Sequence, residues 1–258
     1  FPQDIEILEQ RITGTGWVGT KRVNSSGVRA WKPNAECIWK QHGVWEVDDQ
    51  NHPRLLRPGY FSAVNNKIVD FNQDYLKPFA NKFAHTIRSI HPGAVVFFEG
   101  EPHVKPPVWE SHDARNIVYA PHWYDGYVLY FKSFSSWRAA ELRGRARLVL
   151  GKGAIRRSFA AQVREIQKDA KERMGNPPVL VGEVGLPFDL DKKRAFHTGD
   201  YRDQIAAINR SLTAMDDNLM NYTLWNYTAD NTNERGDRWN DEDFSIFTIT
   251  RDEEEAVQ

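Results

Sequence analysis

Four short apolar runs, each bounded by proline, glycine or polar residues, punctuate the chain beyond its first third. They are residues 94–98, 116–120, 179–183 and 222–225. Short runs with such borders are typical of strands buried in a parallel sheet. The pattern therefore predicts four strands between Ala94 and Trp225.

Amphipathic stretches lie before and between these runs, with apolar residues spaced so that they share one helical face. The predicted buried faces are Phe79, Phe83, Ile87 and Ile90, then Ile155, Phe159, Val163, Ile166, Ala170 and Met174, then Tyr201, Ile205, Ile208, Leu212 and Met215. Gly175 is expected to end the second helix, and Asp200 to cap the start of the third. The stretch after Asp125 is also expected to be helical, with a basic interruption between Gly144 and Gly153.

Strands that alternate with helices indicate parallel βα units, so the predicted fold class is α/β of the (β/α)8 TIM-barrel type. A whole barrel takes about 250 residues, but the first 70 residues show no clean periodicity and cannot supply four more units. We therefore predict an irregular insertion segment over 1–70 with one or two short strands or helical turns. The C-terminal βα units, strands five to eight, follow over 71–247, with an acidic tail over 248–258.

Composition narrows the function classes. A net charge of -1 offers no electrostatic basis for binding nucleic acid. No apolar run approaches the roughly 20 residues that a membrane-spanning helix needs. Cys37 is the single cysteine, which excludes an intrachain disulfide and a cysteine zinc site and is consistent with a reducing compartment. The sequence does not fix the localisation; an intracellular one, in the cytoplasm or vacuole, is favoured. The chain begins at Phe1 rather than Met, so we expect further sequence upstream.

Polar and aromatic groups follow the ends of the predicted strands. They are Glu99 and Glu101, His122 and Tyr124, Glu183, and Trp225. Carboxylates beside a His, a Tyr and a Trp suit glycoside hydrolysis, in which a carboxylate attacks a sugar and a Trp face packs on it. The histidines lack recognised metal-ligand spacings, so neither a metal nor a cofactor is predicted. His103, His112 and His122 are the ones considered.

Glu183 is the most informative of these residues, because a carboxylate between glycines at the end of an apolar run is not selected by core packing. The flanking Gly182 and Gly185 leave room for something to approach. A capping role or an ion pair with an arginine remains open. The aromatic cluster at 37–45 is better explained as a packed loop anchor than as the lining of a site.

Three motifs resemble the last three strands of family 5 glycoside hydrolases. They are residues 118–124 (VYAPHWY), 181–185 (VGEVG) and 224–227 (LWNY). The similarity is greatest to the fungal glucosylceramidase and steryl-glucosidase group, which is related to endoglycoceramidases. Residues 37–45 resemble the insertion before the fifth strand of that group, and residues 231–247 resemble the loop after its last strand.

The resemblance implies roles for four residues. Glu183 would be the nucleophile of a retaining glycosidase, His122 and Tyr124 would hold the nucleophile and substrate, and Trp225 would form the floor of the sugar subsite. The acid/base of the family lies in an Asn-Glu-Pro motif on the fourth strand, and no such motif occurs in these 258 residues. Glu101 is a competing acid, although it maps better to the end of the fifth strand.

The function implied for the complete protein is hydrolysis of lipid β-glucosides, either glucosylceramide or a steryl glucoside. Its partner would be that small-molecule substrate, with peripheral membrane contact as a route to the lipid; the oligomeric state is not predicted. The alternative is a catalytically incomplete carbohydrate- or lipid-binding remnant of the same fold. An Asn-Glu-Pro motif encoded upstream would favour the enzyme.

Overall fold

The computed structural model describes residues 2–11, 14–32, 34–101, 104–142, 147–239 and 242–249. The chain forms two compact units, Phe1–Asp70 and Phe71–Gln258. Most of the predicted acidic tail, from residue 250 onward, lies outside the described residues. Among the helices described, none combines the length and the hydropathy that crossing a bilayer requires.

The first unit begins with a long antiparallel hairpin of β1 (Gln3–Arg11) and β2 (Gly14–Val23). This corrects the expectation of loops with one or two short strands. The hairpin escaped the sequence pattern because neither face is consistently buried: Ile5 and Leu8 are both exposed. An ion pair of 3.0 Å between Asp4 and Arg22 crosses the two strands instead.

Short elements fill the remainder of the first unit. They are α1 (Ile38–Gln41), β3 (Trp45–Val47) paired with β4 (Pro53–Leu55), and β5 (Ala63–Val64) paired with β6 (Lys67–Ile68). The Trp39 ring stands edge-on to Phe61 at 5.1 Å, and His42 Nδ1 lies 2.6 Å from the Tyr60 hydroxyl. These contacts give the 37–45 cluster the packing of a loop anchor.

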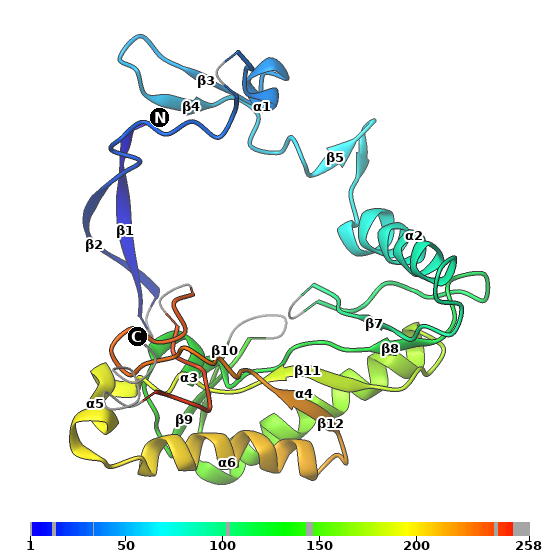
Figure 1. Cartoon of the computed structure of the whole chain (residues 1–258), viewed down its shortest axis with the longest axis vertical. Helices are drawn as coiled ribbons and strands as arrows, with labels where there is room; N and C mark the ends of the chain where they lie inside the picture. Colours follow the sequence, from blue (N-terminus) through cyan, green and yellow to red (C-terminus); the bar gives the residue numbers. More distant parts are fainter. Residues whose placement is uncertain are drawn as a thin grey trace. The chain divides into compact units, whose positions relative to one another are not determined.

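The second unit is built on four parallel strands. They are β7 (Val96–Phe98), β8 (Ile117–Tyr119), β11 (Leu180–Val184) and β12 (Asn221–Leu224). β7 pairs with β8 and β11 pairs with β12, while single parallel bridges, one of them between His122 and Glu183, join β8 to β11. The strands therefore lie in chain order (Figure 1), as the four predicted runs require.

Helices and one further hairpin precede and connect these strands. They are η1 (Asn72–Leu76, a π-helix), α2 (Lys77–Arg88), α3 (Gly126–Phe131), β9 (Arg138–Glu141) paired with β10 (Arg147–Leu150), α4 (Lys152–Arg173), α5 (Leu190–Thr198) and α6 (Arg202–Asp216). The predicted stripe of α4 is confirmed, with Phe159 and Val163 fully buried in the core. Gly175, at a φ of 71°, follows the helix as predicted.

Two other expectations were wrong, the second of them only in part. The stretch after Asp125 holds only the short α3 before the chain turns into the β9–β10 hairpin, whose Ala139 is fully buried. The predicted face of α6 holds at Met215, which is fully buried, but not at Ile205, which is exposed. Small residues such as Ala207 and Ser211 also pack inward. Ala207 packs with Val128, Leu186 and Leu190, and a hydrophobicity pattern does not reveal that such a small side chain faces the core.

The start of α6 also differs slightly from the expectation. Asp200 Oδ1 accepts the N–H of Arg202 at 3.2 Å, but the N-cap position is Tyr201. Asp200 therefore assists the first turn from one residue further upstream. A short loop that also pairs Asp200 with the guanidinium of Arg202 produces this offset.

The predicted stripe of α2 is exposed rather than buried: Phe79 is 63% and Phe83 46% accessible. Ala80 and Ala84 face the core instead. Strand β7 also exposes an aromatic ring: Phe98 is buried in the core, but Phe97 is exposed. Within the described residues, α2 and β7 thus expose apolar rings, and exposed apolar surface drives association.

We expect a polypeptide of these 258 residues to self-associate through this surface. Phe79→Glu combined with Phe83→Lys should shift it toward a monomer in analytical ultracentrifugation, because both rings leave the apolar surface. Lys82→Glu on the same helix is the control and should not change the distribution. A monomeric parent at every concentration would contradict the expectation.

Candidate active site

Glu183 lies within β11 as its last residue but one, where the strand runs between β8 and β12. The expectation that its glycines leave room for a ligand is corrected by their surroundings. A Cβ at Gly182 would lie 3.0 Å from the carbonyl oxygen of Ala120, and one at Gly185 would overlap that of Trp225. The glycines therefore admit the backbones of the neighbouring strands.

Two side chains from the end of β8 hold the Glu183 carboxylate. The Tyr124 hydroxyl donates to Glu183 Oε2 at 2.8 Å, and His122 Nδ1 lies 3.1 Å from the same oxygen. No described residue bonds Oε1. One oxygen is thus anchored while the other is available, which is the arrangement that a carboxylate nucleophile needs.

Electrostatics keep Tyr124 in its donor form. Burial raises the pKa of its hydroxyl, and the hydrogen bond to Glu183 and the negative charges of Glu183, Glu242 and Glu99 raise it further. The phenol therefore remains protonated throughout the range in which proteins are folded. It acts as a permanent hydrogen-bond donor to Glu183.

A second carboxylate, that of Glu99, joins this site from the residue directly after β7. Its Oε1 lies 3.1 Å from His122 Nδ1, so one ring nitrogen faces both Glu99 and Glu183. Burial raises the pKa of Glu99; the charge of Glu183 raises it further and His122 opposes the rise. Sequence reasoning placed Glu99 at a strand end but assigned it no role.

Glu101 does not share the contact that Glu99 makes with His122. It is exposed and lines a small cavity of about 40 Å³ together with His122 and Tyr124. No described side chain pairs with its carboxylate. The Glu101–Glu183 catalytic pair stays a prediction, because the two carboxylates of a retaining pair stand about 5–5.5 Å apart and make no direct contact.

Trp225 and the loop that follows border the site on the side of β12. The backbone N–H of Trp225 donates to the backbone carbonyl of Val184 at 3.0 Å. This bond places Trp225 beside the strand that carries Glu183. The Phe244 ring stands edge-on to Tyr124 with centroids 5.9 Å apart. Sequence reasoning missed Phe244, because nothing in a polar loop marks which ring folds back.

Buried polar contacts hold this loop in shape. Asn231 Nδ2 donates to Asp237 Oδ1 at 2.8 Å and to Asp243 Oδ1 at 3.0 Å. Asp237 Oδ2 in turn accepts the N–H of Phe244 at 2.8 Å. Burial raises the pKa of Asp243, and the charges of Asp189 and Asp237 add to this. The network fixes the position of Phe244 against Tyr124.

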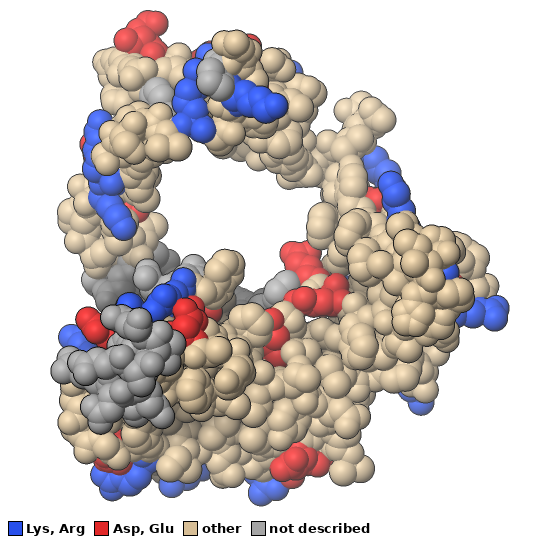
Figure 2. Space-filling model, viewed as in Figure 1, with Lys and Arg blue, Asp and Glu red and all other residues tan. Residues whose placement is uncertain are grey.

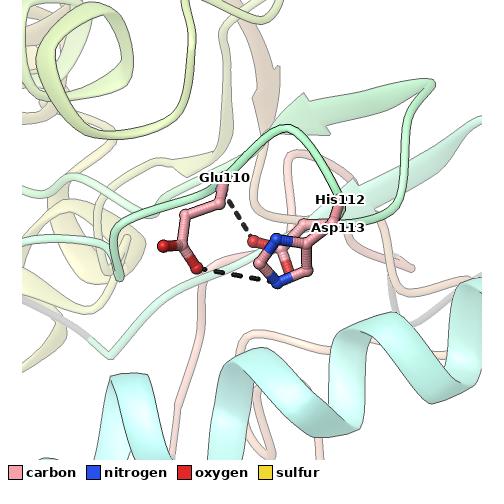
Figure 3. Close-up of side chains that lie close together, drawn as sticks. All are labelled: Glu110, His112 and Asp113. Carbon is pink, nitrogen blue, oxygen red and sulfur yellow. Dashed lines mark hydrogen bonds and ion pairs between the residues drawn. The ribbon is translucent and has the colours of Figure 1, made fainter.

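A group of side chains that could hold a metal ion lies in the loop between β7 and β8 (Figure 3). One potential ligand atom each of Glu110, His112 and Asp113 lies within 4.8 Å of the others. The Lys77 ammonium of α2 lies 2.8 Å from both carboxylates. It lowers the pKa of Glu110. At Asp113 burial raises the pKa, but the hydrogen bonds from Lys77, the Glu110 N–H and Asn81 together lower it further. The carboxylates already have a cation, so we interpret the group as an ion-pair network. His103 lies outside the described residues.

Charge is unevenly distributed over the second unit. On the face drawn in Figure 2, acidic side chains of this unit gather in one place where no basic side chain is visible. Across the whole chain the charges nearly cancel, with 34 basic and 35 acidic residues. The concentration of acidic groups on this face (Figure 2) is thus local.

Comparison with known proteins identifies the family. A model of cellulase (glycosyl hydrolase family 5) matches residues 45–231, which is most of the chain. The chain belongs to glycosyl hydrolase family 5. The resemblance seen in its motifs is thereby confirmed. The predicted fold class, part of a (β/α)8 barrel, is confirmed with it.

Individual members of the family that resemble the chain are glucosidases of lipids by name. The chain is 34% identical to a glucosylceramidase of Rhizopus delemar and 36% identical to an ergosteryl-beta-glucosidase of Saccharomyces cerevisiae, over 92% and 84% of its length. It matches the crystal structure of Cryptococcus neoformans sterylglucosidase 1 with a TM-score of 0.82 and 29% identity over 96% of its length. The chain spans about a third of these proteins: 36%, 30% and 39%.

Proposed function

We propose that this protein is a retaining β-glucosidase of lipid glucosides in which Glu183 is the nucleophile. The observation that carries the proposal is the Glu183 carboxylate, held through one oxygen by Tyr124 and His122 at the ends of adjacent parallel strands. In barrels of this type, catalytic groups gather at the carboxyl ends of the strands.

The chemistry follows from this geometry. Glu183 Oε1 attacks the anomeric carbon, the bond from that carbon to the departing oxygen breaks, and a covalent glucosyl-enzyme forms. Water then displaces Glu183 from the sugar, so the configuration is retained. Tyr124 and His122 keep Oε2 in place during both steps. The proton for the departing oxygen comes from a group that we do not assign to this chain.

The lipid part of the substrate is proposed from the relatives, which are named for glucosylceramide and ergosteryl glucoside. Such substrates are embedded in membranes, so we also propose peripheral contact with a bilayer. Trp225 is proposed as the floor of the glucose subsite, because aromatic faces pack well against sugar rings.

The test uses the full-length protein with glucosylceramide and a steryl glucoside as separate substrates. We expect release of glucose from at least one of them, with the β-anomer appearing first in proton NMR. Binding without hydrolysis of either lipid would support the remnant hypothesis instead. First appearance of the α-anomer would contradict a retaining mechanism.

Tyr124→Phe should lower kcat about 10- to 100-fold with little change in KM. The reason is that a hydrogen bond to a charged group is worth about 1.5–3 kcal/mol, while the ring that packs on Phe244 is kept. Steady-state kinetics on a 4-nitrophenyl glucoside measures the effect. Tyr130→Phe, at an exposed position of α3, should match the parent. A Tyr124→Phe enzyme with the parent kcat would exclude this role for the hydroxyl.

A further inference from the structure

The Glu99 side chain occupies an unfavourable place for a carboxylate. It is 44% exposed, and the less exposed Glu183 carboxylate, at 21%, lies at the same distance from the same imidazole nitrogen. Two carboxylates beside one nitrogen repel each other, and the partial burial of Glu183 weakens its hydration. His122 is the only described group that attracts Glu99 in compensation. An arrangement with this cost is expected where it supports a function.

The contacts at His122 define what Glu99 does to the ring. Both neighbours of Nδ1 are carboxylate oxygens at 3.1 Å, so Nδ1 must carry the hydrogen. With carboxylate oxygens from β11 and from the residue after β7, this N–H lies beside two negative charges, which together hold the ring plane. With Glu183 as its sole acceptor, the ring could rotate with that side chain and would no longer fix it.

We propose that Glu99 is a positioning residue that fixes the tautomer and plane of His122, and through His122 the orientation of the Glu183 carboxylate. This inference rests on the proposed function, because it assigns Glu183 the nucleophilic role. It adds a carboxylate from the end of β7 that does not itself attack the sugar or protonate the departing oxygen.

Glu99→Gln in the full-length protein tests the proposal, with Glu172→Gln on the exposed side of α4 as the matched loss of one carboxylate. Two substrates are compared: a 2,4-dinitrophenyl glucoside, whose departing group needs no proton, and a steryl glucoside, whose departing group needs one. We expect kcat to fall roughly tenfold to a hundredfold by a similar factor on both, with KM nearly unchanged, because a misplaced reacting group costs about that much.

Each outcome of this comparison supports or overturns the positioning role of Glu99. A much larger loss on the steryl glucoside than on the activated one would make Glu99 the proton donor and overturn the positioning role. A Glu99→Gln enzyme with parent kinetics on both substrates would also overturn it. Glu99→Asp keeps the charge but shortens the reach, so we expect an intermediate kcat; thermal unfolding of all variants shows whether the fold is intact.

A second measurement separates this inference from the proposed function. With 13Cε1-labelled histidine, the His122 NMR signal is assigned by its loss in His122→Asn. We expect the signal to move in Glu99→Gln and to stay in place in Glu172→Gln, whether or not the protein hydrolyses a glucoside. An unmoved signal overturns the inference. A moved signal with an inactive parent instead overturns only the proposed function.

Discussion

Glu183→Gln in the full-length protein is expected to lower glucoside hydrolysis by about 10⁴-fold or more while leaving the fold intact. The amide retains the shape of the side chain and can still accept the hydrogen bond from Tyr124, but it cannot supply the attacking carboxylate. Loss of a nucleophile removes the covalent step itself, and effects of this size follow in other hydrolases. Steady-state kinetics and thermal unfolding measure activity and stability.

The control for this experiment is Glu172→Gln, which removes a carboxylate from an exposed position and should keep the parent rate. Incubation with a 2-deoxy-2-fluoro glucoside adds a direct readout. The parent should accumulate a covalent adduct on the peptide that contains Glu183, detected by mass spectrometry. A Glu183→Gln protein that turns over at the parent rate, or an adduct on another residue, would remove Glu183 from the mechanism.

The largest effect on stability is expected at the buried ion pair between Arg210 of α6 and Asp125, which precedes α3. Asp125 is 3% exposed and its Oδ1 accepts the N–H groups of Tyr127 and Val128, while Oδ2 contacts the Arg210 guanidinium. Burial raises the pKa of Asp125, and Arg210 opposes the rise. The arginine is what permits a carboxylate to stay charged here.

Arg210→Met is expected to lower the free energy of unfolding by about 3–5 kcal/mol, because it leaves a buried charge without its partner. The defect should shrink as the pH falls, since protonation of Asp125 removes the uncompensated charge. Urea unfolding at pH 7 and at pH 5 measures both. In the double variant with Asp125→Asn, the loss should be smaller than the sum of the single losses.

A surface ion pair provides the contrast. Arg156 and Asp217 form a similar pair at 2.9 Å, but the arginine side chain is 66% exposed. Arg156→Met should cost less than about 1 kcal/mol, because solvent screens such pairs. Equal losses for the Arg156 and Arg210 variants would show that burial does not set the strength of the Arg210 pair.

The sequence predicts the site only in part, as the residues at the strand ends show. Glu183 and His122 follow apolar runs that the pattern located, and parallel strands bring their ends to one edge, so their proximity was predictable. The choice between Glu99 and Glu101 was not. β7 ends at Phe98, and beyond that point no periodicity indicates where a side chain points.

The sequence by itself determined the elements whose burial is periodic, because a stripe such as that of α4 records which side faces the core. The tertiary structure decided three other features: which strand backbones meet Gly182 and Gly185, which face of α2 remains exposed, and which carboxylate shares the nitrogen of His122. Each depends on what a neighbouring segment brings to that point in space. Local side-chain chemistry does not encode the position of such a neighbour.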